Sequence, residues 1–177
     1  MSDTGRRPDP IRIARWTVTS GSNVNSRAAV VLAAGGHDWQ ASAEGNGAID
    51  ALVRAVNAAL ADVLGGDPLL LAFDVHALAE GPDAEGRVTV RIAPPSAATG
   101  ERASGRFTGE VRSTNIVAAS VEAYVEALNA LLGDASWADA TAAAGARRGP
   151  AARTDRGSTT ADFDDDAQPD TTAWFNR

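Results

Sequence analysis

Apolar residues recur at intervals of three and four positions in two segments of the chain, and this spacing predicts two amphipathic helices. The first segment covers residues 49–63 and stops before Gly65 and Gly66, which favour a helix end. The second covers residues 115–132, with Asn115 or Thr114 as a candidate cap. The predicted buried stripes are Ile49, Leu52, Val53, Val56, Leu60 and Val63, and then Val117, Val121, Val125, Leu128 and Leu132.

Alternating apolar and polar residues precede each helix and predict three β-strands in each half of the chain. Gly35 and Gly36 stand between the second and third strands, as in a hairpin turn. Residues 80–83, with the sequence Glu-Gly-Pro-Asp, form another predicted turn. The predicted strands cover residues 11–19, 27–34, 37–44, 69–78, 86–93 and 105–111.

The two halves therefore share the order β-β-β-α, and their helices align without gaps when Asn57 is set against Asn129. Half of the identical pairs are alanines, which match easily by chance. The asparagine within both apolar stripes is a more informative match. We predict an α+β fold with a duplicated β-β-β-α unit, in which the helices pack on antiparallel sheet and share one core.

The ends of the chain differ in composition from residues 11–133, which we predict to form the folded domain. Residues 1–10 are polar and contain two prolines, so we predict a disordered lead-in. Residues 134–177 hold few apolar groups, so we predict a disordered tail, although Trp137 and the alanines after it fit a helical turn. The tail ends near Trp174-Phe175, either as an untethered terminus or as a peptide that docks on a partner or on the domain.

Composition limits the partners and the compartment. The chain has 177 residues, a net charge of −7 and a pI near 4.7. Nucleic acids and anionic membranes attract basic surfaces, so neither is an expected partner. The absence of cysteine excludes disulfides and favours a reducing compartment, which we take to be the cytoplasm. No segment resembles a signal peptide or a membrane span.

The sequence offers no set of residues suited to catalysis. The two histidines, His37 and His76, lack a metal-binding spacing. His76 lies in an apolar run, where a structural histidine is commoner than a ligand or a base. No serine has the context of a nucleophile, and the chain has no lysine for a phosphate-binding loop. We therefore expect no catalytic residues, no metal and no cofactor.

One short stretch, Gly45-Asn46-Gly47, joins a predicted strand to the first predicted helix; we call it the glycine turn. Its glycines permit positive φ angles and allow other groups to approach the backbone closely. The start of a helix offers free N–H groups and a partial positive charge, which together can hold a carboxylate or a phosphate. A plain tight turn explains the same residues and is the commoner outcome for such a motif alone.

Three blocks of sequence carry a family resemblance. The first is residues 16–21 with the strand that follows, and the second is residues 45–51, close to Gly-Asn-Gly-Pro-[Ile/Val]-Asp-Ala. The third combines residues 76–84 with residues 115–120. In this order they resemble the C-terminal regulatory domain of 2-isopropylmalate synthase, the first committed enzyme of leucine biosynthesis, over residues 12–133.

The resemblance implies an allosteric and dimerisation module. In that family leucine binds between two such domains and inhibits a distant catalytic barrel. The implied partners are leucine or a similar branched small acid, and a second copy of the chain or a 2-isopropylmalate synthase. The implied ligand residues are Gly45, Asn46, Gly47, Ile49 and Asp50 in the first block, Leu70, Phe73, His76, Ala77 and Ala84 on the following hairpin, and Ile116 at the second helix.

The chain also departs from the family pattern. The catalytic barrel has no counterpart, so we expect a stand-alone regulatory chain that is not an enzyme. The family's Tyr-x-Glu-His becomes residues 73–76, Phe-Asp-Val-His, which removes a hydroxyl and a carboxylate from the implied pocket. Ala48 replaces a proline. Two alternatives follow: a domain that binds leucine or a similar ligand, or an interaction module that has lost its ligand and pairs with a synthase or another partner.

Overall fold

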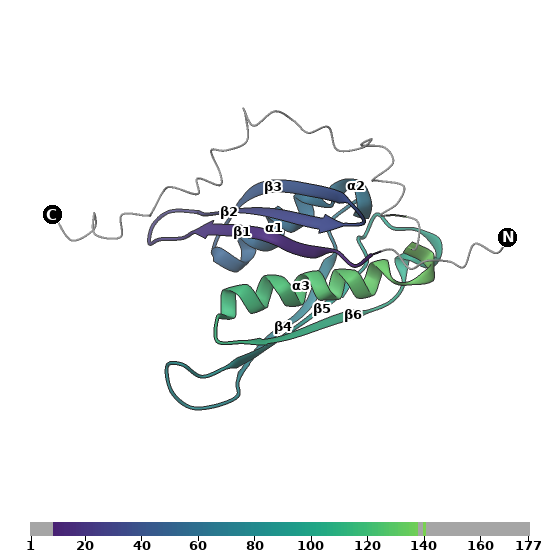
Figure 1. Cartoon of the computed structure of the whole chain (residues 1–177). Helices are drawn as coiled ribbons and strands as arrows, with labels where there is room; N and C mark the ends of the chain where they lie inside the picture. The colour runs from purple at the N-terminus through teal and green to yellow at the C-terminus, as the bar shows by residue number, and fades with distance from the viewer. Residues whose placement is uncertain (1–8, 138–139, 141–177) are drawn as a thin grey trace.

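The computed structural model describes residues 9–137 and residue 140, which form the two predicted halves (Figure 1). Each half contains a three-stranded antiparallel sheet, in the orders β1-β2-β3 and β4-β5-β6. The elements are β1 (Arg12–Thr19), β2 (Ser26–Ala34), β3 (His37–Gly45), α1 (Ala48–Ala59), α2 (Ala61–Leu64), β4 (Leu69–Ala77), β5 (Gly86–Ala93), β6 (Phe107–Ser113), α3 (Ile116–Leu132) and two 3₁₀ turns, η1 (Gly100–Ala103) and η2 (Ala135–Trp137). The α+β class and the repeated β-β-β-α order are confirmed.

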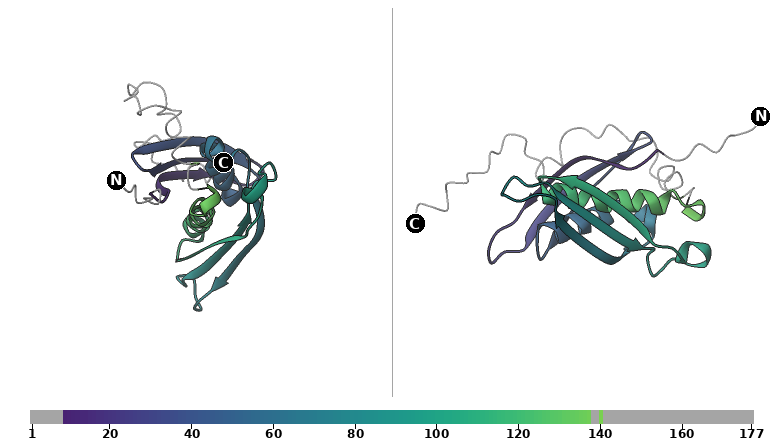
Figure 2. Two further views of the ribbon diagram at one scale, coloured as in Figure 1. Left: turned by 90° about the vertical axis from the view of Figure 1, so that its right-hand side faces the viewer. Right: turned by 90° about the horizontal axis from the view of Figure 1, so that it is seen from below.

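The helices lie on the inner faces of the sheets and meet each other (Figure 2). Helix α1 packs on β2 and β3, and α3 packs on β5 and β6. The buried side chains from both halves form a single cluster, as expected if neither half can cover its own apolar surface. Its largest fully buried members include Trp39, Leu52, Ile92, Tyr124 and Leu128.

The strand boundaries follow the prediction with two local differences. The pairing of β1 with β2 shifts between Ile13 and Arg15, and the apolar positions slip by one residue there, from Ile13 to Trp16. Strand β6 begins at Phe107, two residues later than predicted from the sequence. Gly105 has a φ angle of 114°, which lies outside the β region and therefore cannot continue a strand.

The first helix was predicted to run unbroken over residues 49–63, and this is wrong. Helix α1 ends at Ala59, and Leu60 has φ −99° and ψ 13°, so that the one-turn helix α2 follows after a bend. Val63 and Leu64 are buried beyond the bend. Gly65, with φ 68°, then ends α2 in the left-handed conformation, as its sequence position predicted.

The two aligned asparagines both make buried or half-buried hydrogen bonds, but to different partners. Asn57 Oδ1 of α1 accepts a bond of 2.6 Å from the Tyr124 hydroxyl of α3. Asn129 of α3 accepts from the N–H of Ile11 at 2.8 Å and donates to its carbonyl at 2.7 Å. Ile11 directly precedes β1, whereas the residue directly before β4 is Pro68, which has no N–H to donate.

Packing continues past residue 133, where the sequence analysis placed the end of the domain. Trp137 is only 2% exposed and belongs to the core cluster. The predicted lead-in and tail lie largely outside the described residues, as does Trp174-Phe175. Within the described part of the chain, no helix is long and apolar enough to cross a membrane.

Substituting Tyr124→Phe removes the donor to Asn57 and leaves a buried amide oxygen unsatisfied. We expect the free energy of unfolding to fall by about 1–3 kcal/mol, measured by urea denaturation. The matched control is the same substitution in an Asn57→Leu background, where the bond no longer exists and the added loss should be close to zero. Equal losses in both backgrounds would show that the hydrogen bond contributes nothing.

Candidate functional site

The glycine turn brings the end of β3 against the first turn of α1. A Cβ atom on Gly45 would lie 2.5 Å from the backbone nitrogen of Ala51 and 2.6 Å from Asp50 Oδ2. No other residue type fits this approach. Neither glycine uses the positive φ angles that glycine permits, because neither is among the residues with positive φ. Gly47 has an extended backbone (φ −156°, ψ 171°) and open space around its Cα.

Asp50 supplies a negative charge within the glycine turn itself. Its Oδ2 accepts a hydrogen bond from the Asn46 N–H at 2.9 Å, and the Arg54 Nε–H lies 3.0 Å from both carboxylate oxygens. The Asn46 bond, and after it the Arg54 bond, lower the pKa of Asp50, so the carboxylate is ionised at neutral pH.

The first intrahelical bond of α1 runs from the Ala51 N–H to the Gly47 carbonyl. The N–H groups of Ala48 and Ile49 precede it and have no acceptor within the helix. The turn therefore presents hydrogen-bond donors beside the Asp50 carboxylate. Backbone donors beside a carboxylate can hold the carboxylate and the ammonium group of an amino acid at the same time.

A second surface is formed by the face of β4 that continues the buried face of β5. We call Leu70, Phe73, Val75 and Ala77 the apolar row. In the antiparallel register they pair with Ile92, Val90, Val88 and Gly86 of β5, so they share one face of the sheet. The β5 residues are buried, whereas Leu70, Phe73 and Val75 are 53%, 36% and 44% exposed. Helix α3 covers β5 and β6, and β4 extends beyond it.

Ile116 joins the apolar row at the turn end of the β4–β5 hairpin. Its Cδ1 atom lies where a Cβ on Gly86 would stand, and Gly86 pairs with Ala77. Ala84 lies nearby in the chain, half-buried in the turn that its N–H closes onto the Gly81 carbonyl at 3.2 Å. Leu70, Phe73 and Ala77 therefore share one face of the sheet, with Ile116 at the Ala77 end and Leu70 at the other.

His76 is not part of this group. It pairs with Arg87, and cross-strand partners alternate in face along the sheet, so His76 lies on the face opposite to the apolar row. Val75, in contrast, was treated in the sequence only as a departure from a family motif. The register makes it the centre of the apolar row, which alternation alone suggests once the buried face is known.

The glycine turn, the starts of both long helices and the C-terminal end of β4 lie toward the same end of the molecule (Figure 1), and the apolar row runs from there along β4 to Leu70. They belong to different halves, and among the described residues no hydrogen bond or ion pair joins them. One chain thus presents the implied ligand residues on two separate surfaces.

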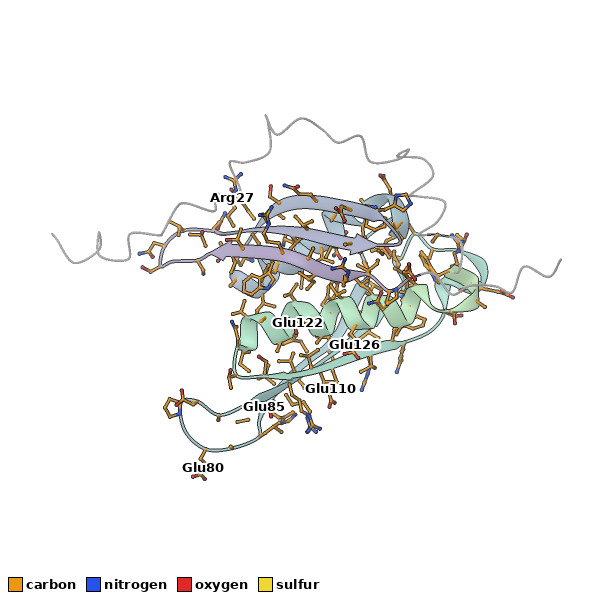
Figure 3. All side chains as sticks on the ribbon, in the orientation of Figure 1. Arg27, Glu80, Glu85, Glu110, Glu122 and Glu126 are labelled. Carbon is orange, nitrogen blue, oxygen red and sulfur yellow. The ribbon has the colours of Figure 1, made fainter. Side chains whose placement is uncertain are left out.

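The two edges of the second sheet differ. Figure 3 shows Glu110 of β6 beside Glu126 of α3, and the Glu126 carboxylate accepts the Glu110 N–H at 2.9 Å. Gly109 allows this close approach, because a Cβ there would overlap the Ala123 carbonyl and lie 2.6 Å from Ala127 N. Helix α3 therefore closes over the β6 side of the sheet and leaves the β4 side uncovered.

Within the described residues, no group of three histidine, cysteine, aspartate or glutamate side chains is placed to hold a metal ion. The chemistry available at this end of the molecule is binding: donors and one carboxylate on the glycine turn, and apolar side chains on β4.

Comparison with known proteins identifies the family to which the chain belongs. The sequence profile of the LeuA allosteric (dimerisation) domain matches residues 1–132. The chain belongs to this family. Among its relatives, the 2-isopropylmalate synthase of Aromatoleum aromaticum is 35% identical over 133 residues, which is 74% of this chain and 24% of that protein. The synthase of Aquifex aeolicus is 36% identical over 123 residues, or 68% of this chain and 21% of that protein.

This LeuA dimerisation domain spans less than a quarter of the length of these relatives. A third, the 2-isopropylmalate synthase of Prochlorococcus marinus, is 38% identical over 65% of this chain and 19% of its own length. The resemblance to the regulatory domain of that enzyme is therefore confirmed. The part of these synthases that the chain matches is their regulatory domain.

The two glycines of the turn provide a matched pair of substitutions. Gly45→Ala places a methyl group against backbone, so we expect the LeuA domain to lose about 1–3 kcal/mol of stability. Gly47→Ala meets open space in an extended backbone and should change stability little. Thermal and urea unfolding of both variants measure this difference, and equal effects would contradict the close approach at Gly45.

Proposed function

We propose that this LeuA domain works as a pair, with the apolar row of β4 buried against a second copy. The observation that carries the proposal is the exposure of Leu70, Phe73 and Val75 on a face whose β5 half is buried. Monomeric proteins rarely leave such a contiguous apolar patch in water. The family's description as a dimerisation domain supports a second copy as its cover. In this proposal the chain regulates and has no catalytic role by itself.

The opposite face of the same sheet supports this choice of surface. It carries Asp74 of β4 opposite Thr89, and Arg87 and Arg91 of β5 opposite His76 and Ala72. These polar groups suit contact with water, although Leu69, which pairs with Ala93 on this face, is also 50% exposed. A self-complementary apolar patch of this kind fits an interface with two-fold symmetry.

Phe73→Asp places a carboxylate in the proposed interface and should raise the dimer dissociation constant by about a hundredfold or more. Ala72→Asp is the matched control, since it adds the same group to the other face of β4, opposite Arg91, and should leave the dimer intact. Light scattering after size-exclusion chromatography measures both. A monomeric wild type, or a control that dissociates equally, would contradict the proposed surface.

The proposed ligand is leucine or a similar branched amino acid. Its carboxylate would accept from the N–H groups at the start of α1, and its ammonium group would meet Asp50. Its side chain would contact Phe73, Ala77 and Ile116. Because one chain holds the turn and the row apart, we propose that a pair of chains completes the site. The leucine-biosynthesis enzymes to which the chain is similar support an end product of that pathway as the ligand.

Asp50→Asn should weaken leucine binding by about tenfold or more, because it removes the charge that faces the ammonium group. The 2-oxo counterpart of leucine lacks the ammonium group, so we expect it to bind more weakly than leucine. For the same reason, Asp50→Asn should change its affinity little. The lowered pKa of Asp50 keeps its carboxylate ionised in mild acid. Leucine affinity should therefore persist as the pH falls and be lost only when the pH passes through the lowered pKa. Isothermal titration calorimetry measures each affinity.

The calorimetry also separates the two alternatives raised by the sequence. If leucine, isoleucine and valine at millimolar concentration all give no heat while the dimer persists, the ligand part of the proposal fails. The protein would then be a pairing module without a branched-chain ligand.

A further inference from the structure

A cavity of about 460 Å³ lies at the opposite end of the molecule from the glycine turn. Its walls come from α2 of the first half, from residues 97–99 and η1 of the second half, and from Trp137 and Ala140 beyond α3. This volume falls within the roughly 300–1,000 Å³ typical of small-molecule sites. All of the wall residues are described, and none belongs to the leucine-type site proposed above.

Arg102 is held in place on the cavity wall. Its guanidinium carbon lies 5.0 Å from the centroid of the Trp137 ring, and its Nε–H donates to the Ser136 carbonyl. These two contacts fix the plane of the guanidinium group, and within the described part of the chain its two terminal nitrogens have no hydrogen-bond acceptor. A planar, oriented pair of N–H donors matches the two oxygens of a carboxylate.

The second observation concerns Trp137 itself. Its side chain lines the cavity and is 2% exposed, and its indole nitrogen is buried with no acceptor among the described residues. A buried N–H without an acceptor is costly and uncommon in folded proteins. The unsatisfied donor therefore belongs to a residue of the cavity wall, next to a cation that is held in place.

We infer that this cavity is a second small-molecule site, distinct from the leucine-type site, for a carboxylic acid with an apolar body. The carboxylate pairs with Arg102, and the apolar body lies along Val63, Leu64 and the Trp137 ring. Asp62, which is engaged in an interaction of its own, also lines the cavity. Its negative charge disfavours a ligand that brings a carboxylate and no hydrogen-bond donor. The ligand therefore carries a hydroxyl or amino donor beside its carboxylate.

The site spans both halves of the domain. Helix α2 follows directly on α1, whose other end begins at the glycine turn, and η1 lies between β5 and β6 of the second half. A ligand that contacts both walls would stabilise the arrangement of the halves that the structure shows.

The test is a ¹⁵N-resolved NMR titration of the full chain with three probes: leucine, 2-hydroxy-4-methylpentanoate, and 3-methylbutan-1-ol, which lacks the carboxylate. The four tryptophans each give an indole N–H signal, and Trp137→Phe assigns one of them. We expect the Trp137 signal to shift and saturate with at least one of the two acids and not with the alcohol.

Variants then locate the binding. Arg102→Gln should weaken it at least about tenfold, and Thr99→Phe, which fills the cavity from an exposed position, should abolish it. Arg106→Gln, another exposed arginine outside the cavity, is the matched control and should bind normally. Asp50→Asn should also bind normally, which separates this site from the leucine-type site.

An unshifted Trp137 signal with both acids at millimolar concentration would overturn the inference. So would a loss of binding in Arg106→Gln equal to that in Arg102→Gln. If Asp50→Asn abolished the Trp137 shift, the two sites would not be distinct, and the second site would be rejected while the leucine-type site stood.

Discussion

The structure depends on one shared core, because neither half can bury its own helix. Each sheet supplies one apolar face, each long helix covers part of it, and the remaining apolar surface of α1 and α3 is buried where the two helices meet. The Tyr124–Asn57 hydrogen bond crosses this junction in a buried environment, and burial raises the pKa of Tyr124. The two halves therefore stabilise each other and form one domain.

The same arrangement explains where the domain exposes apolar surface. Helix α3 is drawn close to β6 through Gly109, and Glu126 satisfies the backbone of the β6 edge. A helix placed there covers β5 and β6 but leaves Leu70, Phe73 and Val75 of β4 exposed. The apolar row of β4 is thus left over from the packing of the second half. In the proposed pair, an interface with a second copy would use this surface without any change in the domain itself.

The element order and the helix stripes could be predicted from periodicity, since alternation and the spacing of three and four report directly which face is buried. The bend at Leu60 could not, because residues on both sides of it are apolar and buried. The sequence offered two properties of glycine at the turn, positive φ angles and close approach, and the structure shows that Gly45 uses the close approach. The burial of Trp137 in the core could not be predicted, because the sequence around it is alanine-rich and polar and shows no apolar stripe.

For the candidate site too, some features follow from the sequence and others only from the tertiary structure. The sequence by itself determined the family, the glycine turn and the residue types that could meet a branched amino acid. Only the tertiary structure decided which of them share a surface: the register puts Phe73, Val75 and Ala77 on one face and His76 on the other. It also decided that Asp50 fills part of the turn and that β4 is uncovered. Local sequence specifies strands and turns through nearest neighbours, whereas faces, edges and cavities depend on elements that are distant in the chain.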